Sequence, residues 1–321
     1  MVKKVAFINF KGGVGKTTLT AEIASKLVYS HNKKVLLVDM DPQTNLSYYF
    51  MDYSTWERNV NSNGSLKDLF NTYISGGLST PPFDVNTIIM KDFYVNPDTG
   101  GHTLRNLSLL PAHLEAMGIE ADLAFEIGRK AGDPTHLEKQ KALERFYDMI
   151  NILKNALQPV QENYDFIFFD CPPSVGLLTQ NALAASDRYV VPAIPDYLST
   201  VGFNFLGKRI DEMRKRVNIA LRARNTNNEF RGPIPAGLIL TRVRVYRWNP
   251  LQFVSPQDIV FDRISRDQQM SQLLFKNFLS ESARAQESAE DKIPVAIRSG
   301  KKYEDSRTQI ENITKEFLAR V

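Results

Sequence analysis

The sequence predicts a doubly wound α/β fold with a mostly parallel sheet and helices on both faces. Short apolar runs alternate with helical patterns along the 321 residues, and several runs have apolar residues at consecutive positions, as buried parallel strands do. The first two runs and the pattern between them have the size of one strand, helix, strand unit. The composition is that of a globular protein, with 43% hydrophobic residues, and no apolar run approaches the roughly 18 residues of a membrane span.

Six apolar runs are the predicted strands. An amphipathic helix with Leu19, Ile23 and Leu27 on one stripe lies between the first two and ends at a polar turn. We expect one domain over residues 1–321, because no segment has the length and composition of an interdomain linker. The predicted strands cover residues 5–10, 35–39, 107–110, 166–170, 189–194 and 236–240.

Gly, Pro, Asn and Ser gather in two regions that we predict to be insertions or loops, residues 50–106 and 222–235. Within the first region, residues 52–65 are predicted to be a loop and residues 66–73 a short helix. The last segment, residues 303–321, has an apolar stripe and is predicted to be a C-terminal helix docked on the domain.

The net charge of +4 is unevenly distributed. Residues 1–160 hold 17 Lys and Arg against 17 Asp and Glu, whereas residues 208–247 alone hold 11 basic and three acidic side chains. Such a local excess indicates an anionic partner, although solvated basic helix faces are also common. The lone Cys171 cannot form an internal disulfide, which is typical of a reducing cytosol.

The strongest motif is a glycine-rich loop that follows the first predicted strand and opens the first predicted helix. Glycines let backbone N–H groups turn toward a phosphate, and a helix N-terminus adds its partial positive charge. We expect Lys16 to reach the β and γ phosphates of a nucleotide and Thr17 to offer its hydroxyl to Mg²⁺. The expected nucleotide-binding residues are Lys11, Gly12, Gly13, Val14, Gly15, Lys16, Thr17 and Thr18.

Two further strands end in carboxylates. Asp39 and Asp41 follow the second predicted strand, and Asp170 ends the apolar strand at residues 166–170. Ligands bind at the carboxyl edge of such sheets, so these side chains are expected near the phosphates. An acidic group in the position of Asp170 holds Mg²⁺ through its water shell. Taken alone, Asp39 can equally be an ordinary turn residue at the end of a strand.

The loop departs from the pattern G-x-x-x-x-G-K-[ST], because Phe10 fills the first glycine position and Lys11 precedes Gly12. In this it resembles the deviant Walker A loop of the ParA/MinD family of P-loop ATPases. The resemblance extends to residues 35–43 and 164–174 and, more loosely, to the end of the chain. It implies ATP and Mg²⁺ as cofactors and an ATPase that is weak until a partner stimulates it.

The same resemblance implies the roles of the site residues. Lys11, Lys16 and Asp41 would be catalytic, with Lys11 reaching the phosphates of the other subunit in an ATP-sandwich homodimer. Asp41 would orient or activate the attacking water, and Thr17, Asp39 and Asp170 would serve the metal.

The sequence is most similar to ParA-type DNA partition ATPases without an N-terminal helix-turn-helix domain. We expect non-specific DNA binding, release when a ParB-like or other adaptor protein stimulates hydrolysis, and a cytoplasmic, nucleoid-associated location. One cysteine excludes the iron–sulfur relatives, and the acidic residues of the last helix argue against membrane binding. The expected DNA-binding residues are Arg214, Lys215, Arg216, Arg222, Arg224, Arg244 and Arg247.

Three alternatives stay open. One is a positioning ATPase for a protein cargo, which the sequence does not distinguish from one that segregates a plasmid or chromosome. Another is a MinD-like membrane-associated switch. The third is a P-loop kinase for a small molecule, against which the extra Lys11 counts.

Overall fold

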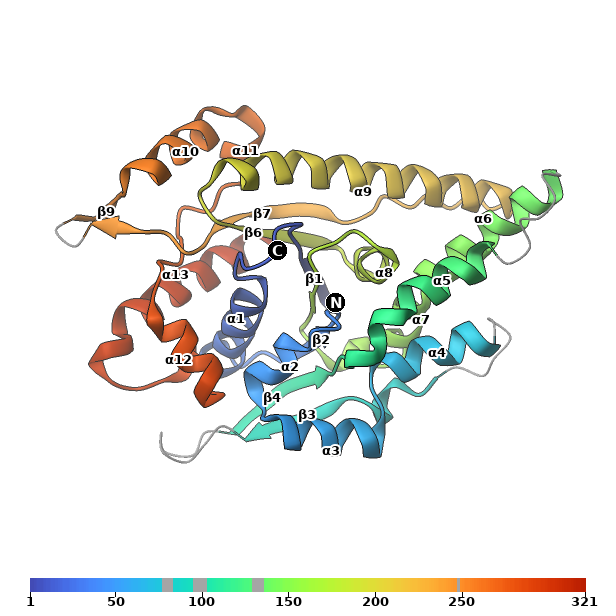
Figure 1. Ribbon diagram of the computed structural model, residues 1–321, viewed down its shortest axis with the longest axis horizontal. Coiled ribbons are helices and arrows are strands. Elements are labelled where there is room, and N and C mark those ends of the chain that lie inside the picture. The colour runs from blue at the N-terminus through green and yellow to red at the C-terminus, as the bar shows by residue number, and fades with distance from the viewer. Residues whose placement is uncertain (77–82, 95–102, 129–135, 247–248) are drawn as a thin grey trace.

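The computed structural model describes residues 1–76, 83–94, 103–128, 136–246 and 249–321. Its centre is a seven-stranded sheet in the order β3-β4-β2-β5-β1-β6-β7, in which all neighbours are parallel except the edge pair β3 and β4 (Figure 1). The strands are β1 Lys3–Phe7, β2 Val35–Asp39, β3 Met90–Tyr94, β4 Thr103–Leu110, β5 Phe166–Asp170, β6 Arg188–Ala193 and β7 Ile234–Leu240. A separate antiparallel pair is formed by β8 Val245–Tyr246 and β9 Asn249–Phe253.

Helices cover both faces of the sheet, which confirms the predicted fold class. The α-helices are α1 Lys16–His31, α2 Asn45–Phe50, α3 Tyr53–Asn63, α4 Leu66–Gly76, α5 Ile119–Gly128, α6 His136–Ile150, α7 Ile152–Leu157, α8 Leu177–Ala185, α9 Tyr197–Ala223, α10 Ser255–Arg266, α11 Gln268–Leu273, α12 Ala283–Asp291 and α13 Glu304–Arg320. Short 3₁₀ turns are η1 Val85–Thr87, η3 Leu114–Gly118, η4 Gln161–Asn163, η5 Val295–Ile297 and η6 Lys301–Tyr303. In the described residues, no helix is both long and apolar enough to span a membrane.

Alternation along the buried strands divides the core into two layers. Ala6 and Phe169 face one layer with α4 to α9, whereas Phe7 and Phe168 face the other with α1 and α13. Helix α13 packs against this second layer through Phe317, whose ring contacts both Phe7 and Phe168. The last helix of the chain is therefore part of the core beneath the glycine-rich loop.

The segment between residues 50 and 106 is more regular than the sequence predicts. Residues 53–63 form the helix α3 rather than a loop, because the side chain of Asp52 accepts a hydrogen bond from the Thr55 N–H (2.7 Å) and so caps the helix. Trp56 and Val60, one turn apart, bury the inner face of α3. The edge strand β3 was not predicted, and residues 103–106 belong to β4. Parts of this region lie outside the described residues.

Two other boundaries differ from the prediction. Strand β1 runs from Lys3 to Phe7 rather than over residues 5–10, because the chain leaves the sheet at Ile8 to form the glycine-rich loop. Helix α9 continues to Ala223 and β7 begins at Ile234, so the predicted irregular segment is confined to residues 224–233.

Candidate functional site

The glycine-rich loop joins β1 to α1 at the carboxyl edge of the sheet. Gly13 and Gly15 have φ angles of 72° and 79°, a left-handed conformation that favours glycine. Gly15 is the N-cap of α1, and no side chain caps that helix. The first N–H groups of a long helix therefore begin where the loop turns, which is the arrangement that binds a phosphate.

Lys16 is buried at the start of α1, and its Nζ donates a hydrogen bond to the Lys11 carbonyl 3.1 Å away. The lysine thus spans the loop from end to end. Burial lowers the pKa of Lys16, while the carboxylates of Asp170 and Asp41 oppose this shift. A cation in this position is a ready counter-charge for a bound phosphate.

Thr17 and Asp170 are brought together as the sequence predicts. The Thr17 hydroxyl donates to Asp170 Oδ2 at 2.7 Å, and the Thr20 hydroxyl lies 3.4 Å from Oδ1. Burial raises the pKa of Asp170 to about 7. Within the described ranges, no cluster of three His, Cys, Asp or Glu side chains could hold a metal. The hydroxyl oxygen of Thr17 and the carboxylate oxygens of Asp170 suit Mg²⁺, which needs few protein ligands because it keeps water and phosphate ligands.

Asp39 stands opposite Asp170 in the register of β2 and β5 but makes different contacts. Its Oδ2 accepts hydrogen bonds from the N–H (2.9 Å) and the hydroxyl (2.7 Å) of Ser47, and its Oδ1 accepts one from the Asp41 N–H (3.3 Å). The carboxyl is fully buried, which raises its pKa to about 8. These contacts anchor α2 and the turn before it to the end of β2.

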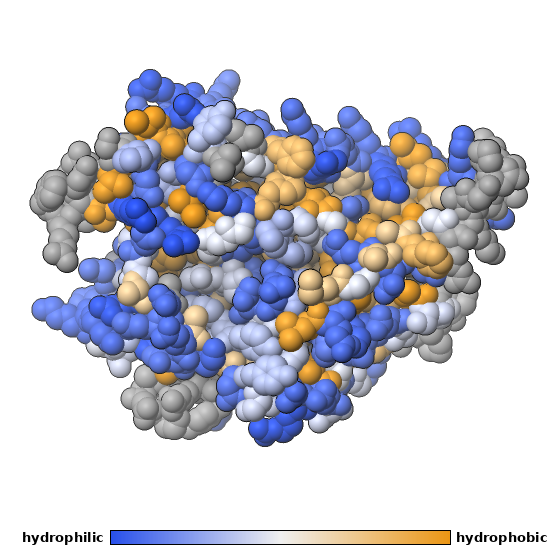
Figure 2. Space-filling model, in the orientation of Figure 1, coloured by the Kyte–Doolittle hydropathy of each residue, from blue (hydrophilic) through white to orange (hydrophobic). Residues whose placement is uncertain are grey.

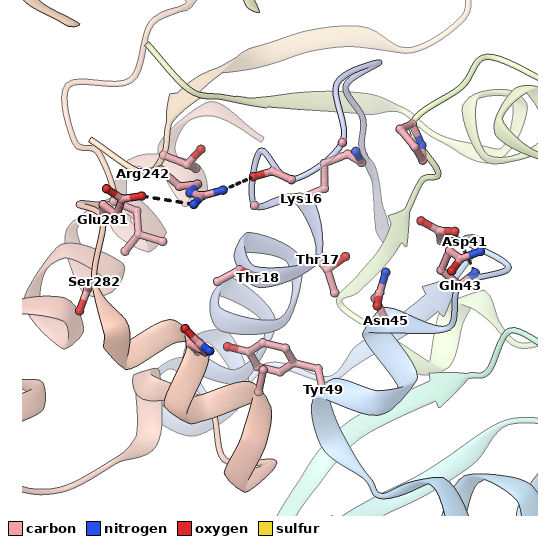
Figure 3. A pocket seen from close by; sticks show the side chains of 18 of the residues that line it. Lys16, Thr17, Thr18, Asp41, Gln43, Asn45, Tyr49, Arg242, Glu281 and Ser282 are labelled. Carbon is pink, nitrogen blue, oxygen red and sulfur yellow. Dashed lines mark hydrogen bonds and ion pairs between the residues drawn. The ribbon is translucent and has the colours of Figure 1, made fainter. Parts of the chain in front are cut away.

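Asp41 lies on that turn and lines a pocket of about 680 Å³ beside the loop (Figure 3). The other walls come from the loop and α1, the end of β7, and the segment that leads into α12. Arg242 bridges two of these walls, because its guanidinium donates to the Gly13 carbonyl (3.2 Å) and pairs with Glu281 (3.2 Å). The pocket is lined by Gly12, Gly13, Gly15, Lys16, Thr17, Thr18, Asp41, Gln43, Asn45, Tyr49, Pro173, Thr241, Arg242, Leu279, Ser280, Glu281, Ser282, Ala283, Gln286 and Ala289.

Sequence reasoning missed most of the wall formed by residues 279–289. Ser282 caps α12 by accepting a hydrogen bond from the Arg284 N–H (3.1 Å), but nothing in the local pattern indicates that this helix faces a loop some 270 residues earlier. It also missed Tyr49, whose hydroxyl donates to the fully buried Glu22 (2.7 Å). The sequence signal for α12 is the serine cap at its start. Such a cap predicts where a helix begins but not which site the helix faces.

Glu22 joins three segments around the pocket. Besides Tyr49 of α2, the carboxylate accepts hydrogen bonds from the N–H groups of Val295 (2.8 Å) and Ala296 (2.7 Å), in η5. Burial raises the pKa of Glu22, and the three hydrogen bonds oppose that shift. Helix α1, helix α2 and the C-terminal segment therefore share one buried acceptor.

Lys11 does not line the pocket. Its side chain forms an ion pair with Asp196, immediately before α9, and its N–H donates to Asn9 Oδ1 (3.0 Å). The buried Asn9 amide in turn donates to the Pro192 carbonyl (2.7 Å) at the end of β6. The first turn of the glycine-rich loop is thus tied to the chain that leads into α9.

The basic residues of α9 fall into two groups. Arg214, Lys215 and Arg222 have exposed side chains, with Arg214 paired to Asp211 (2.6 Å). The Arg216 guanidinium lies over the Phe146 ring (3.8 Å), and Arg224 pairs with Asp148 and donates to the Glu144 carbonyl (3.0 Å). Arg224, just after α9, is therefore engaged within the chain, whereas Arg216 packs on α6 through its ring contact and keeps an exposed side chain.

The two predicted DNA-binding residues beyond β7 are placed differently. Arg244 forms an ion pair with Glu281 (2.5 Å), which also pairs with Arg242. One carboxylate therefore binds both arginines at the pocket rim. Arg247 lies outside the described residues.

Comparisons with known proteins show the family to which the chain belongs. A family model described as an AAA domain matches residues 2–223. The sporulation initiation inhibitor protein Soj of Bacillus subtilis is 32% identical over 225 residues, 69% of this chain and 70% of Soj. The chromosome partitioning protein ParA of Myxococcus xanthus is 30% identical over 214 residues, 67% of this chain and 60% of that protein. An uncharacterized Mycobacterium tuberculosis relative is 31% identical, and the match spans only 54% of its length.

Solved structures share the fold over the full chain. McdA of Cyanothece, in its ATP complex, superposes with a TM-score of 0.68 at 18% identity and covers 100% of this chain and 97% of McdA. A plasmid partition protein of Borrelia burgdorferi bound to AMPPNP gives a TM-score of 0.59 at 22% identity and covers 100% of both chains. The sequence matches together with the loop, Lys16 and Asp170 lead to one assignment: the chain belongs to the AAA-domain family of ParA-type P-loop ATPases.

Proposed function

We propose that this chain is a partition or positioning ATPase that binds Mg·ATP in the pocket beside the glycine-rich loop. The observation that carries the proposal is the cluster of Lys16, Thr17 and Asp170 at the start of α1, next to a pocket large enough for a nucleotide. Homologues named Soj and ParA support the same assignment.

We assign each residue a role that its contacts support. Lys16 would release the Lys11 carbonyl and bind the β and γ phosphates. Thr17 would hold Mg²⁺ directly, and Asp170 would hold it through water. Bound Mg²⁺ neutralises phosphate charge during phosphoryl transfer. Asp41, at the pocket wall, would orient the attacking water, while Asp39 fixes the turn that carries Asp41.

Lys11 would act on the ATP of a second subunit. This requires an ATP-dependent dimer and a break in the ion pair between Lys11 and Asp196, because Lys11 does not line the pocket of its own chain. A cation that arrives with a partner subunit stabilises transition-state charge in the same way as an arginine finger.

The output would be non-specific DNA binding in the cytoplasm, on the nucleoid, through exposed cations. Lys215, Arg216 and Arg222 of α9 are exposed and would contact phosphates, and Arg214 and Arg244 are exposed although paired. An adaptor protein would stimulate hydrolysis and so release the dimer from DNA.

Nucleotide binding by Lys16→Ala tests the enzymatic part of the proposal. Loss of this cation removes the phosphate counter-charge, so a fluorescent ATP analogue should bind the variant at least 100-fold more weakly and ATP turnover should vanish. Lys34→Ala, which removes an exposed lysine before β2, is the matched control and should keep both activities. Ordinary ATP affinity in Lys16→Ala would contradict the assignment.

A further inference from the structure

Helix α5 has an apolar face that nothing in the described part of the chain covers. Its inner face is buried through Ile119 and Leu123, as a core helix requires. The opposite face carries Met117, just before the helix, and Phe125, which are 68% and 67% exposed. Ala121, Ala124 and Gly128 lie on the same outward face and are also exposed.

The spacing of these outward residues is helical. Positions 117, 121, 124, 125 and 128 follow the three- and four-residue steps that form one stripe on a helix. Figure 2 shows the stripe as light orange atoms over α5, with blue atoms beside them. A helix that is apolar on both sides is normally buried on both sides, so the outward stripe is typical of a docking surface.

The stripe is flanked by negative charge. Residues 114–128 contain four carboxylates, Glu115, Glu120, Asp122 and Glu126, and no Lys, Arg or His. Asp122 is exposed beside the stripe, whereas Glu120 turns toward α8. Lys67 of α4 pairs with Glu115 at one end of this surface. The small side chains of Ala121, Ala124 and Gly128 would let a second helix approach closely between the larger Met117 and Phe125.

The negative charge around the α5 stripe determines which kind of partner can bind there. An isologous contact with a second copy would place the same carboxylates against each other. Nucleic acid and anionic lipid are repelled for the same reason. A helix with an apolar stripe and Lys or Arg at its edges matches both the shape and the charge of this surface.

The surface is connected to the nucleotide pocket through one carboxylate. Glu120 accepts a hydrogen bond from the Leu178 N–H (3.4 Å) at the start of α8. Gly176 makes this approach possible, because a Cβ there would lie 2.0 Å from Glu120 Oε1. Only the segment 171–177 separates this contact from Asp170, and Pro173 of that segment lines the pocket.

We infer that the outward face of α5, with η3, is the docking site for a basic amphipathic helix of a partner protein. The binding itself stands on this surface alone, while its effect on ATP turnover rests on the proposed function. A partner helix bound to α5 would shift Glu120, and through its contact with α8 it would move the loop that follows Asp170.

Designed peptides of known composition test the surface on the full chain. The probe is a fluorescent 20-residue helical peptide with Leu on one face and Lys on the other. The reference peptides keep the Leu face and replace Lys with Glu, or scramble the Lys peptide so that no stripe remains. We expect the Lys peptide to bind at least 10-fold more tightly than either reference by fluorescence anisotropy. Equal binding of all three would overturn the inference.

Variants then locate the binding site. Met117→Gln with Phe125→Gln should weaken the Lys peptide at least 10-fold, and Asp122→Lys should weaken it while improving the Glu peptide. Ile259→Gln, on α10, removes an apolar side chain that is 63% exposed and should change nothing. Unchanged binding in the α5 variants would place the peptide elsewhere and contradict the inference. Thermal melting of each variant checks that the fold is intact.

Two measurements separate this inference from the proposed function. The α5 variants should keep wild-type affinity for a fluorescent ATP analogue, whereas Lys16→Ala should lose it and still bind the Lys peptide. If the peptide binds α5 and wild-type protein does not bind the ATP analogue, the proposed function fails and the surface stands. If the analogue binds and the peptide does not, the surface fails alone.

Discussion

Lys11 and Asp196 form an ion pair that joins the first turn of the glycine-rich loop to the chain leading into α9. They lie 185 residues apart in the sequence. The pair holds Lys11 within its own subunit, next to the helix that carries the exposed cations. Any role of Lys11 in a second subunit begins with the loss of this contact.

Replacement of Asp196 with asparagine should favour the dimer. A partly exposed ion pair contributes about 0.2–1 kcal/mol, and the dimer breaks one pair in each subunit, so Asp196→Asn should lower the dimer dissociation constant by up to about 30-fold in a slowly hydrolysed ATP analogue. Sedimentation velocity over a concentration series measures this constant. Asp211→Asn, which breaks the pair with Arg214, is the control. A weaker or unchanged Asp196→Asn dimer would show that the pair does not restrain Lys11.

Asp41→Ala should separate ATP binding from hydrolysis. Loss of the group that orients the attacking water should reduce turnover about 100-fold or more, while ATP still binds and the dimer persists. Phosphate release and sedimentation on the same sample report both effects. Asp84→Ala, which removes an exposed carboxylate just before η1, should behave as wild type. Unchanged turnover in Asp41→Ala would remove its assigned role.

The raised pKa of Glu22 predicts how stability depends on pH. Because the folded state holds this proton above the usual glutamate range, the unfolded state binds fewer protons between the two pKa values. The contribution of Glu22 to the free energy of unfolding should therefore fall as pH rises above about 4.5. Urea denaturation of wild type and Glu22→Gln from pH 4.5 to 8 measures it as their difference. A difference that grows with pH would reverse the sign.

Much of the fold could be predicted from the sequence because its signals are local. Consecutive apolar residues mark β2 and β5, and the loop at residues 11–18 fixes the start of α1. Helix α3 was wrongly predicted as a loop, because its Asn and Ser content hides the Asp52 cap and the Trp56 and Val60 pair. Composition does not show when tertiary packing overrides propensity.

The site was predictable only where one strand end or loop carries it. Lys16, Thr17 and Asp170 follow from motifs, and the parallel register then brings them together. The wall at residues 279–289 and the pairing of Lys11 depend on contacts between distant segments. Charge counts indicated a basic α9 but not that Arg216 and Arg224 pack against α6.

The exposed cations of α9 give a prediction for DNA binding. Arg214→Ala with Lys215→Ala should lower affinity for random duplex DNA and reduce the salt slope by about two, because each lost phosphate contact removes roughly one released counterion. Arg216→Ala should lower the melting temperature through its lost contact with Phe146. Arg58→Ala with Lys34→Ala, which removes two exposed cations away from α9, is the charge-matched control. An unchanged salt slope in the double variant would exclude α9 as the DNA surface.

The central claim is that ATP controls DNA binding, and one titration tests it most directly. Binding of the full chain to fluorescent random duplex DNA is measured by anisotropy with Mg·ATP, with Mg·ADP and without nucleotide, from about 50 to 200 mM salt. The account predicts tight binding with ATP alone, at least 10-fold weaker binding in the other two states, and a steep loss of affinity with salt. Binding that is absent, or equal in all three states, would contradict it.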